Sequence, residues 1–189
     1  MRQMASFLET APLIGLADLR RNKRQLPEER GLYGFFFSTP PGIATTQGCY
    51  ERDGRWLMYI GSAGATLHFD GNLRKRLGKN HLGGNERGST ICETLAALMP
   101  EMVGPAIIKF EKGKPKNHTS LLGKVKLKHW MDENIAVCWT TNPRPGDVEE
   151  GLVRQFAPSL NLDFSAHPFS ARLSGLRKAR GDLARAEEA

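Results

Sequence analysis

Residues 31–37 read Gly-Leu-Tyr-Gly-Phe-Phe-Phe, and the interpretation of the whole chain starts from this run. It is short, rich in aromatic side chains and followed by the breaker segment Ser-Thr-Pro-Pro-Gly at 38–42, which is the pattern of a buried strand. A second such run, residues 56–61, follows the turn signal Asp-Gly at 53–54, so the two strands can pair as an antiparallel hairpin with a long connection. Residues 135–140 combine β-branched and aromatic side chains and predict a third strand.

The spacing of apolar residues predicts five helices around these strands. The first is short, lies around residues 73–77 and has one apolar and one cationic face. The others are expected over residues 91–99, 120–133, 148–156 and 172–186. The helix over 120–133 is expected to turn Leu121, Leu122, Val125 and Trp130 toward the core. This mixture of elements predicts an α+β fold, with a small three-stranded antiparallel sheet flanked by helices.

The composition is that of an ordinary globular protein. Of the 189 residues, 40% are hydrophobic and 25% are charged, which excludes a fibrous or largely disordered chain and fits one domain. No apolar stretch approaches the roughly 20 residues of a membrane-spanning helix, and the first residues lack the apolar region of a secretory signal. Cys49, Cys92 and Cys138 form no CxxC pair, which argues against disulfides and a cysteine-based zinc site. We therefore expect a cytoplasmic protein with free thiols.

Positive charge is concentrated in two stretches of the chain. The formal net charge is +7, but residues 72–87 hold five cations against one glutamate, and residues 109–128 hold seven lysines against one glutamate. The rest of the chain is therefore net negative, a segregation that predicts a nucleic-acid partner. For residues 111–117 by themselves we expect only a solvated loop. The expected nucleic-acid-binding residues are Arg74, Lys75, Lys79, Lys124, Lys126 and Lys128.

Four short motifs, each common by itself, occur in a specific order. Residues 31–33, Gly-Leu-Tyr, open the first predicted strand, and residues 59–61, Tyr-Ile-Gly, end the second. Arg76 lies on the cationic helix, and Glu149 and Asn161 are 12 residues apart with a proline between them. This constellation resembles the GIY-YIG nuclease family, in particular an uncharacterised bacterial subgroup of it. Domains of this family carry the two tripeptides on a hairpin, an arginine on the next helix and a glutamate on a later one.

The resemblance implies a layout for the chain. Residues 26–165 would form a GIY-YIG-like nuclease domain with insertions. They would be preceded by an N-terminal extension, residues 1–25, and followed by a charged C-terminal helix, residues 166–189. Tyr33 and Tyr59 are 26 residues apart, more than in compact members of the family, so the hairpin must carry an insertion.

One position departs from the family in a way that bears on chemistry. Four residues after Arg76, where the family often has histidine or tyrosine, this chain has Asn80, and His81 follows. Either a shift by one residue brings His81 into the site, or Asn80 takes that place and a general base is lost.

The resemblance also implies an activity, the metal-dependent hydrolysis of phosphodiester bonds in DNA. The planar donors of Arg76 suit the negative charge on the phosphate oxygens. Glu149 would hold one Mg²⁺ or Mn²⁺, which keeps several waters and needs few protein ligands. Tyr33 is expected to act as base or to position the water, and Tyr59 to contact the phosphate, although these roles can be exchanged. Asn161 is expected to orient the glutamate helix or the waters of the metal. The expected catalytic residues are thus Tyr33, Tyr59, Arg76, His81, Glu149 and Asn161.

Two alternatives stay open at this point. One is a catalytically inactive nucleic-acid-binding module on the same scaffold, and Asn80 is the residue that keeps it open. The other is a single-strand or structure-specific nuclease, or a ribonuclease. No recognisable DNA-reading motif accompanies the predicted domain, so neither sequence specificity nor oligomeric state can be argued from the sequence.

Overall fold

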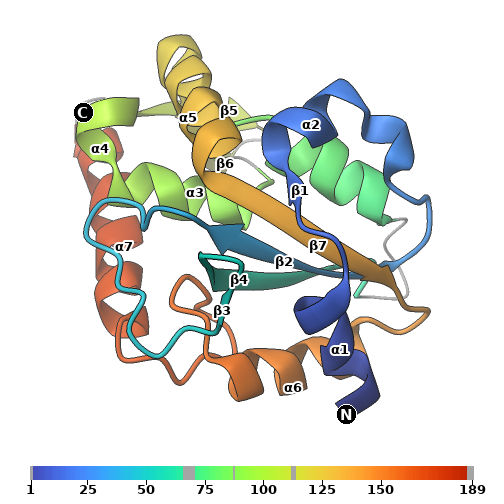
Figure 1. Ribbon diagram of the computed structural model, residues 1–189. Helices are drawn as coiled ribbons and strands as arrows, with labels where there is room; N and C mark the ends of the chain where they lie inside the picture. Colours follow the sequence, from blue (N-terminus) through green and yellow to red (C-terminus); the bar gives the residue numbers. More distant parts are fainter. Residues whose placement is uncertain (1, 66–70, 87, 112–113, 187–189) are drawn as a thin grey trace.

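The strand β2 (Gly31–Phe37) lies at the centre of the main sheet of the molecule (Figure 1). The computed structural model describes residues 2–65, 71–86, 88–111 and 114–186, and within them this sheet has five antiparallel strands in the order β1-β7-β2-β4-β3. The other strands are β1 (Ile14–Gly15), β3 (Glu51–Arg52), β4 (Arg55–Ala63) and β7 (Ile135–Thr141). The predicted α+β class and the predicted antiparallel pairing of the first two strands are confirmed.

The sheet has five strands rather than the predicted three. The two additional strands, β1 and β3, have two residues each and form the edges of the sheet. A strand of two residues shows no alternation of apolar and polar side chains, which takes at least four residues to recognise. Short edge strands of this kind also limit pairing with other chains.

The lysine-rich segment is a hairpin and not the solvated loop expected for residues 111–117. The strands β5 (Ala106–Glu111) and β6 (Lys114–Thr119) pair antiparallel, with Ala106 opposite Thr119 and Glu111 opposite Lys114. Residues 112 and 113, between them, lie outside the described part of the chain. The prediction was wrong because frequent lysines removed the apolar alternation by which strands are recognised, whereas the backbone ladder of a two-stranded ribbon does not require it.

Helices surround the main sheet, and all five predicted helices are present with ends shifted by a few residues. They are the π-helix η2 (Arg74–His81), α3 (Thr90–Leu98), α5 (Leu121–Asn134), α6 (Gly146–Phe156) and α7 (Ser170–Ala186). The structure also contains α1 (Arg2–Thr10), α2 (Leu16–Arg21), the 3₁₀ turn η1 (Lys23–Gln25) and α4 (Pro100–Val103).

Helices cover both faces of the sheet, which explains why β2 is apolar throughout. On one face, Leu32 and Phe36 pack with side chains of α1 and α6, which lie below the sheet in Figure 1. On the other face, Tyr33, Phe35 and Phe37 pack with side chains of α2, η2, α3, α5 and α7. Every residue of β2 is buried, and each buried phenylalanine stabilises the fold by about 2 kcal/mol.

The helix α5 is rotated relative to the orientation predicted from its sequence. Leu121, Leu122 and Val125, expected in the core, are 81%, 64% and 58% exposed. The buried side is instead formed by Leu127 and Met131, four residues apart, with Trp130 partly buried beside them as predicted. At the start of the helix, Gly123 makes the contact with the end of α4. A Cβ at this position would lie 2.3 Å from the carbonyl oxygen of Val103. The sequence prediction overlooked this glycine contact and therefore assigned the wrong face to the core.

Two expectations drawn from composition can be compared with the structure. The three cysteines are free, as predicted. Burial raises the pKa of Cys92 to about 11 and that of Cys138 to about 12, so both thiols stay protonated at neutral pH. Among the helices in the described ranges, none is long and apolar enough to cross a membrane.

The orientation of α5 leads to a first prediction. Leu127→Ala should lower the free energy of unfolding by about 2–5 kcal/mol, because it leaves a cavity in the core. Leu122→Ala, the same change on the same helix, should alter it by less than about 0.5 kcal/mol, because Leu122 is exposed. Urea denaturation of both variants measures the difference. Equal losses in the two variants would show that α5 is not oriented as described.

Candidate active site

A cavity of about 510 Å³ opens where several separate segments of the chain meet. It is lined by residues of β2, β4, η2, α3, α6 and α7, and by the loop after α6. Of the six predicted catalytic residues, five line it: Tyr33, Tyr59, Arg76, Glu149 and Asn161. The sixth, His81, is fully buried behind Tyr33 and reaches the cavity only through that side chain. Residues up to 128 positions apart in the sequence are thus gathered as predicted.

Tyr33 lies across β4 because the residue opposite it is a glycine. In the ladder between β2 and β4, Tyr33 pairs with Gly61. A Cβ on Gly61 would lie 2.5 Å from the hydroxyl oxygen of Tyr33 and 2.6 Å from its ring carbon Cζ, so a larger side chain would displace the ring. Burial raises the pKa of Tyr33, which keeps its phenol protonated at neutral pH.

Tyr59 lies on the same face of the sheet as Tyr33, directly next to a β-bulge. Between β2 and β4 the register shifts, so that Phe35 pairs with Tyr59 while Phe36 pairs with Leu57, and Met58 is the extra residue. The rings of Tyr33 and Tyr59 are 6.5 Å apart between centroids. Burial raises the pKa of Tyr59 as well, although nearby positive charge and a hydrogen bond with Thr90 oppose that shift. Two protonated phenols therefore face one cavity.

The π-helical form of η2 brings Arg76 and His81 to the same side. In an α-helix, side chains five residues apart differ by about 140° in direction. A π-helix has i→i+5 hydrogen bonds and one more residue in each turn, and at the end of η2 the amide of Leu82 bonds the carbonyl of Leu77 at 3.0 Å. The one-residue shift that the sequence raised as a possibility is therefore produced by the helix type. His81, and not Asn80, contacts Tyr33.

A chain of hydrogen bonds runs inward from Tyr33. The Tyr33 hydroxyl is 2.7 Å from Nε2 of His81, and Nδ1 of His81 is 2.8 Å from the hydroxyl of Ser89. Ser89 also caps α3, where its oxygen accepts a hydrogen bond from the amide of Cys92. Burial, assisted by the charge of Arg76, holds the pKa of His81 well below its usual value, so the imidazole is neutral at pH 7.

Arg76 connects this chain of hydrogen bonds to the loop before α3. Its Nε donates to the hydroxyl of Tyr33 at 3.3 Å, and one terminal nitrogen donates to the carbonyl of Gly88 at 3.0 Å. A guanidinium carries five N–H donors, so donors are left over for a ligand in the cavity. Arg76 is thus fixed by the protein and still able to bind an anion.

Glu149 faces the cavity from the first turn of α6. It is half-buried, and its carboxylate accepts a hydrogen bond from Ser62, the residue after the second motif glycine. Burial raises the pKa of Glu149, and the negative charge of Asp163 adds to this, while Ser62 and Arg76 oppose it. Asp163 lines the same cavity. Two carboxylates near one another in a polar cavity form an oxygen donor set of the kind that hard divalent cations bind.

Asn161 is used by the backbone of β4. Its side-chain oxygen accepts from the amide of Ile60 at 2.9 Å, and its side-chain nitrogen donates to the carbonyl of Ile60 at 2.8 Å. The neighbouring Leu160 amide bonds the carbonyl of Met58. The loop after α6 therefore continues the sheet edge for two residues and holds the bulge that carries Tyr59. Asn161 positions the site, and its amide is occupied by this contact.

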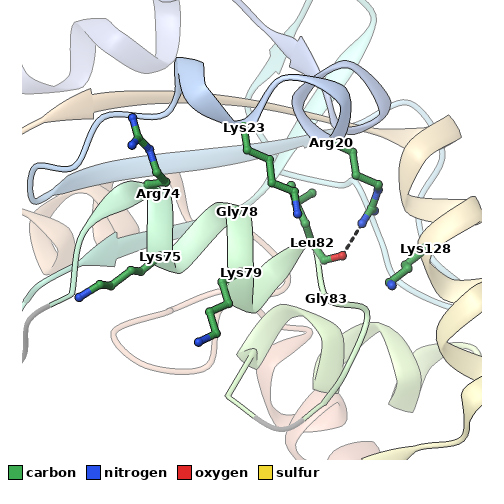
Figure 2. Close-up of a pocket in the computed structure, with 9 residues that line it drawn as sticks. All are labelled: Arg20, Lys23, Arg74, Lys75, Gly78, Lys79, Leu82, Gly83 and Lys128. Carbon is green, nitrogen blue, oxygen red and sulfur yellow. Dashed lines mark hydrogen bonds between the residues drawn. The ribbon is translucent and has the colours of Figure 1, made fainter.

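The predicted nucleic-acid-binding residues are only partly gathered. A second groove, of about 550 Å³, is lined by Lys75 and Lys79 of η2 and by Lys128 of α5, together with Arg20 and Lys23, which the sequence analysis did not single out (Figure 2). Lys124 is one turn from Lys128 on α5, whereas Lys126 lies about 200° around the helix from Lys128, away from the groove.

Two arginines of this groove are engaged in the fold. Arg74, predicted to bind nucleic acid, donates to the carbonyls of Leu26 and Arg24 and pairs with Glu28. Arg20 pairs with Asp132 and donates to the carbonyl of Leu82, as the dashed line in Figure 2 shows. The lysines therefore supply the accessible charge of the groove.

Sequence reasoning missed several contributors to the site, among them Asp163. Ser62 and Thr90 hydrogen-bond Glu149 and Tyr59, and Ser89 contacts His81 in addition to capping α3. Arg177 of α7 lines the cavity, although its segment looks only like a charged terminal helix. The serine directly after the second tripeptide, Ser62, was the one sequence signal that could have been used. The pattern of residues along β4 does not indicate which side chains of α3 and α7 will lie beside it.

Comparison with known proteins agrees with this geometry. The family model described as the GIY-YIG catalytic domain matches residues 31–179, about four fifths of the chain. The match confirms the resemblance inferred from the four motifs. No match was found among curated proteins or among solved structures.

The buried, neutral state of His81 leads to a second prediction. Because its pKa is lowered in the folded protein, the unfolded chain binds a proton more readily below about pH 6.5. The free energy of unfolding should therefore fall as the pH drops from 7 to 5, by up to about 1.4 kcal/mol per pH unit from this group. His81→Gln should lose this part of the pH dependence.

The matched control is His129→Gln, since His129 is exposed on α5. Urea denaturation at several pH values measures all three proteins. If His81→Gln keeps the slope of the wild type, His81 is not buried in its neutral form.

Proposed function

Because this chain belongs to the GIY-YIG nuclease family, we propose that it is a metal-dependent endonuclease that hydrolyses phosphodiester bonds in DNA. The observation that carries the proposal is the convergence of Tyr33, Tyr59, Arg76 and Glu149 on one cavity from four separate elements. A guanidinium can stabilise charge on the phosphate and a carboxylate can hold a divalent cation, while the phenols can bind the phosphate or transfer a proton.

Arg76 binds the phosphate whose bond is broken. Negative charge on the phosphate oxygens grows as water attacks, and a fixed guanidinium stabilises that charge without reorganisation. Its hydrogen bonds with Tyr33 and Gly88 hold the guanidinium in place before the substrate arrives. This pre-organisation supports a role in the transition state rather than in binding alone.

Tyr33 receives the proton of the attacking water and passes its own proton to His81. The phenol oxygen takes a proton from water while the phenol O–H donates to Nε2 of His81, 2.7 Å away, so no buried phenolate has to form. In this arrangement Nδ1–H of His81 donates to Ser89. The negative charge of bound substrate favours the imidazolium that results, because it offsets the effect of burial and of Arg76 on the pKa. Tyr59, beside Tyr33, contacts the phosphate.

The donor set fits Mg²⁺ or Mn²⁺. Glu149 would hold the cation, and the carboxylate of Asp163 on the same cavity wall would hold one of its waters. When bound, the cation supplies charge neutralisation at the phosphate and lowers the pKa of a coordinated water. Ser62 orients the Glu149 carboxylate for this task.

Two rival functions make different predictions. The first is a nucleic-acid-binding module without catalytic activity, which Asn80 suggests because it could replace a general base. The contact of His81 with Tyr33 argues against this module. A single-strand or structure-specific nuclease, or a ribonuclease, would use the same groups on a different substrate. The choice of substrate in the test below separates these from a nuclease of duplex DNA.

The third prediction is a metal-dependent cleavage that needs Glu149. Labelled duplex DNA, single-stranded DNA and RNA are incubated with Mg²⁺, Mn²⁺ or EDTA, and products are resolved on denaturing gels. We expect cleavage of DNA with Mg²⁺ or Mn²⁺, none with EDTA, and a loss of at least about 10²-fold in Glu149→Ala and Arg76→Ala. Arg76→Ala should still bind DNA, because its role lies in the transition state.

Glu150→Ala is the matched control. Glu150 is the next residue of α6 but is exposed and pairs with Arg154, so this variant should cleave as the wild type does. DNA binding without cleavage by any protein would favour the inactive module, and cleavage of RNA alone would replace DNA as the substrate.

The lysine groove of Figure 2 extends the proposal to the path of the nucleic acid. Lys23 and Lys79 are exposed, and Lys128 completes the groove from α5. The groove shares η2 with the cavity, because Arg76 lines the cavity while Lys75 and Lys79 line the groove. A strand whose scissile phosphate lies at Arg76 can therefore place neighbouring phosphates against these lysines.

The fourth prediction concerns the salt dependence of binding. Replacing Lys23, Lys79 and Lys128 together by glutamine should weaken DNA binding and reduce the slope of log K against log salt by about 2–3, one counterion for each lost phosphate contact. Fluorescence anisotropy in EDTA measures binding without cleavage. The control removes three exposed cations outside the groove, Lys126, Arg172 and Lys178, and should change the slope less. Equal changes in both triple variants would remove the groove from the binding path.

A further inference from the structure

Two side chains of the cavity wall have no part in the hydrolysis proposed above. They are Arg177, on α7, and Phe164, in the loop after α6. One is a cation next to a site for anions, and the other is a large aromatic side chain at the surface. Arg177 is largely buried, and Phe164 is exposed with a positive φ; both features are uncommon for their residue types.

Arg177 is held inside the cavity wall and not in solvent. Its side chain is only 18% exposed, and its guanidinium pairs with Glu93 of α3. Its positive charge is one of those that oppose the effect of burial on the pKa of Tyr59, which agrees with its position near that phenol. With five N–H donors and one carboxylate partner, the guanidinium has donors left for an anion in the cavity.

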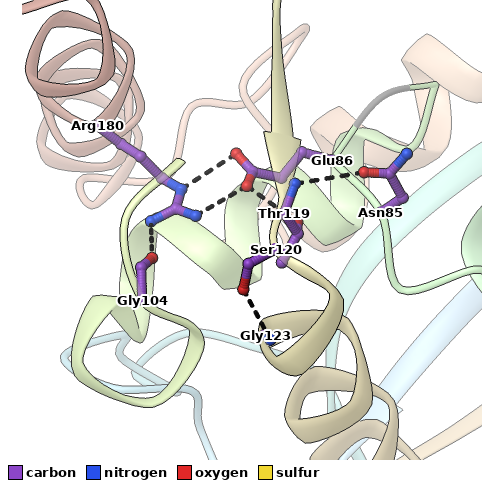
Figure 3. Close-up of polar contacts among 7 residues, drawn as sticks. All are labelled: Asn85, Glu86, Gly104, Thr119, Ser120, Gly123 and Arg180. Carbon is purple, nitrogen blue, oxygen red and sulfur yellow. Dashed lines mark hydrogen bonds and ion pairs between the residues drawn. The ribbon is translucent and has the colours of Figure 1, made fainter. Parts of the chain in front are cut away.

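A buried ion pair one turn further along α7 keeps Arg177 in position. Arg180, 7% exposed, donates to the Glu86 carboxylate at 2.8 and 3.1 Å and to the carbonyl of Gly104 at 2.8 Å (Figure 3). Glu86 also accepts from the hydroxyl of Thr119, so its oxygens are satisfied. A buried pair with this geometry holds the helix firmly, because breaking it would leave a charge without a partner. Arg177, three residues earlier, is thereby kept in place.

Phe164 combines exposure with an unusual backbone. Its side chain is 49% exposed although it lines the cavity, and its φ is +62°, in the left-handed region that bulky residues seldom adopt. The loop is held three residues earlier by the two hydrogen bonds between Asn161 and Ile60. An aromatic side chain kept at the surface by strained backbone is a feature associated with ligand contact.

We propose that this wall is a subsite for the nucleotide next to the scissile phosphate, in which Arg177 binds the phosphate of that nucleotide and Phe164 stacks on its base. The inference rests on the proposed function, since it takes the scissile phosphate to lie at Arg76. A chain of nucleotides presents one phosphate and one base in each unit, and the wall offers one partner for each. Stacking on an aromatic side chain requires a base that is not paired at that position.

The assignment of Arg177 to the neighbouring phosphate follows from the partners of the two arginines. Arg76 bonds Tyr33, the group proposed to take the proton of the attacking water, so it belongs at the reacting phosphorus. Arg177 comes from a different wall and shares its charge with Glu93. An arginine partly neutralised by a carboxylate contributes little to growing charge in a transition state, but it can still bind an anion bidentately.

The fifth prediction compares substrates with one and with several phosphates. Arg177→Gln should raise KM for a short single-stranded DNA by about 10- to 100-fold, the range expected for one charge-assisted hydrogen-bond contact, with a small change in kcat. On bis(p-nitrophenyl) phosphate, which has no neighbouring phosphate, kcat/KM should stay within about twofold of the wild type. An equal loss on both substrates would overturn the assignment.

Two variants separate this role from a structural one. Glu93→Gln removes the partner of Arg177 but keeps the guanidinium, so KM for DNA should be unchanged or lower. Lys178→Gln removes a neighbouring exposed charge of α7 and should leave KM unchanged. If Glu93→Gln raises KM as much as Arg177→Gln does, the ion pair only holds α3 against α7, and the subsite is refuted.

Stacking by Phe164 is tested with an abasic nucleotide. Phe164→Leu, which keeps an apolar side chain without an aromatic ring, should weaken binding of single-stranded DNA by about 5- to 100-fold, while Phe164→Trp should not. An abasic nucleotide is placed on each side of the scissile phosphate in turn, and the side on which it weakens wild-type binding more is used. With this substrate, wild type and Phe164→Leu should bind equally. If the abasic site weakens binding by Phe164→Leu as much as it weakens binding by the wild type, stacking on Phe164 is excluded.

Binding in EDTA distinguishes failure of this inference from failure of the proposed function. If the wild type cleaves no substrate but Arg177→Gln and Phe164→Leu lose affinity for DNA by the stated factors, the subsite stands and the hydrolase does not. If the wild type cleaves and both variants behave as the wild type does in binding and in KM, the hydrolase stands and the subsite is refuted.

Discussion

The site depends on one constraint, the burial of the Tyr33 hydroxyl. Tyr33 lies on a strand covered on both faces, and its side chain has no exposed surface. A buried hydroxyl without partners would destabilise the fold by about 1–3 kcal/mol, so hydrogen-bond partners must come from the protein. They are His81 and Arg76, both supplied by η2. The same contacts that satisfy a polar group in the core therefore bring together the groups to which we assign proton transfer and phosphate binding.

The requirement propagates to the neighbouring elements. Only a π-helix presents Arg76 and His81 on one side, and only a glycine at position 61 leaves room for the ring of Tyr33. Ser89 holds the far nitrogen of His81 while capping α3, so the helix that follows is tied to the same chain of contacts. On the opposite side, the Asn161 amide fixes the bulged part of β4 that carries Tyr59. These elements position one another through the site.

The sequence predicted the long strands, the helices and most of the residues that meet at the cavity, and it failed where the signal is shorter or more indirect. β2, β4 and β7 are apolar because both faces are covered, which gives a strong pattern. A π-helix has no composition of its own, so the choice between Asn80 and His81 depended on a hydrogen-bond pattern that spacing does not reveal. The buried face of α5 was predicted wrongly because its leucines, Leu121 and Leu122, outweighed a contact made by Gly123. The contribution of α7 was missed because a charged helix resembles a solvated one.

The basic charge of the chain is divided between two tasks, and the division follows the chemistry of the two cations. Arg52, Arg74 and Arg180 donate to backbone carbonyls of distant segments, as Arg20 and Arg76 also do. A guanidinium suits this role because its planar fork satisfies several acceptors at once and is only weakly hydrated, whereas an ammonium is strongly hydrated and prefers the surface. Lysines accordingly form the accessible part of the groove in Figure 2, while arginines hold the fold and line the cavity. Part of the cationic total of 27 lysines and arginines is thus used inside the protein, so not every cation counted in the sequence is available to a nucleic acid.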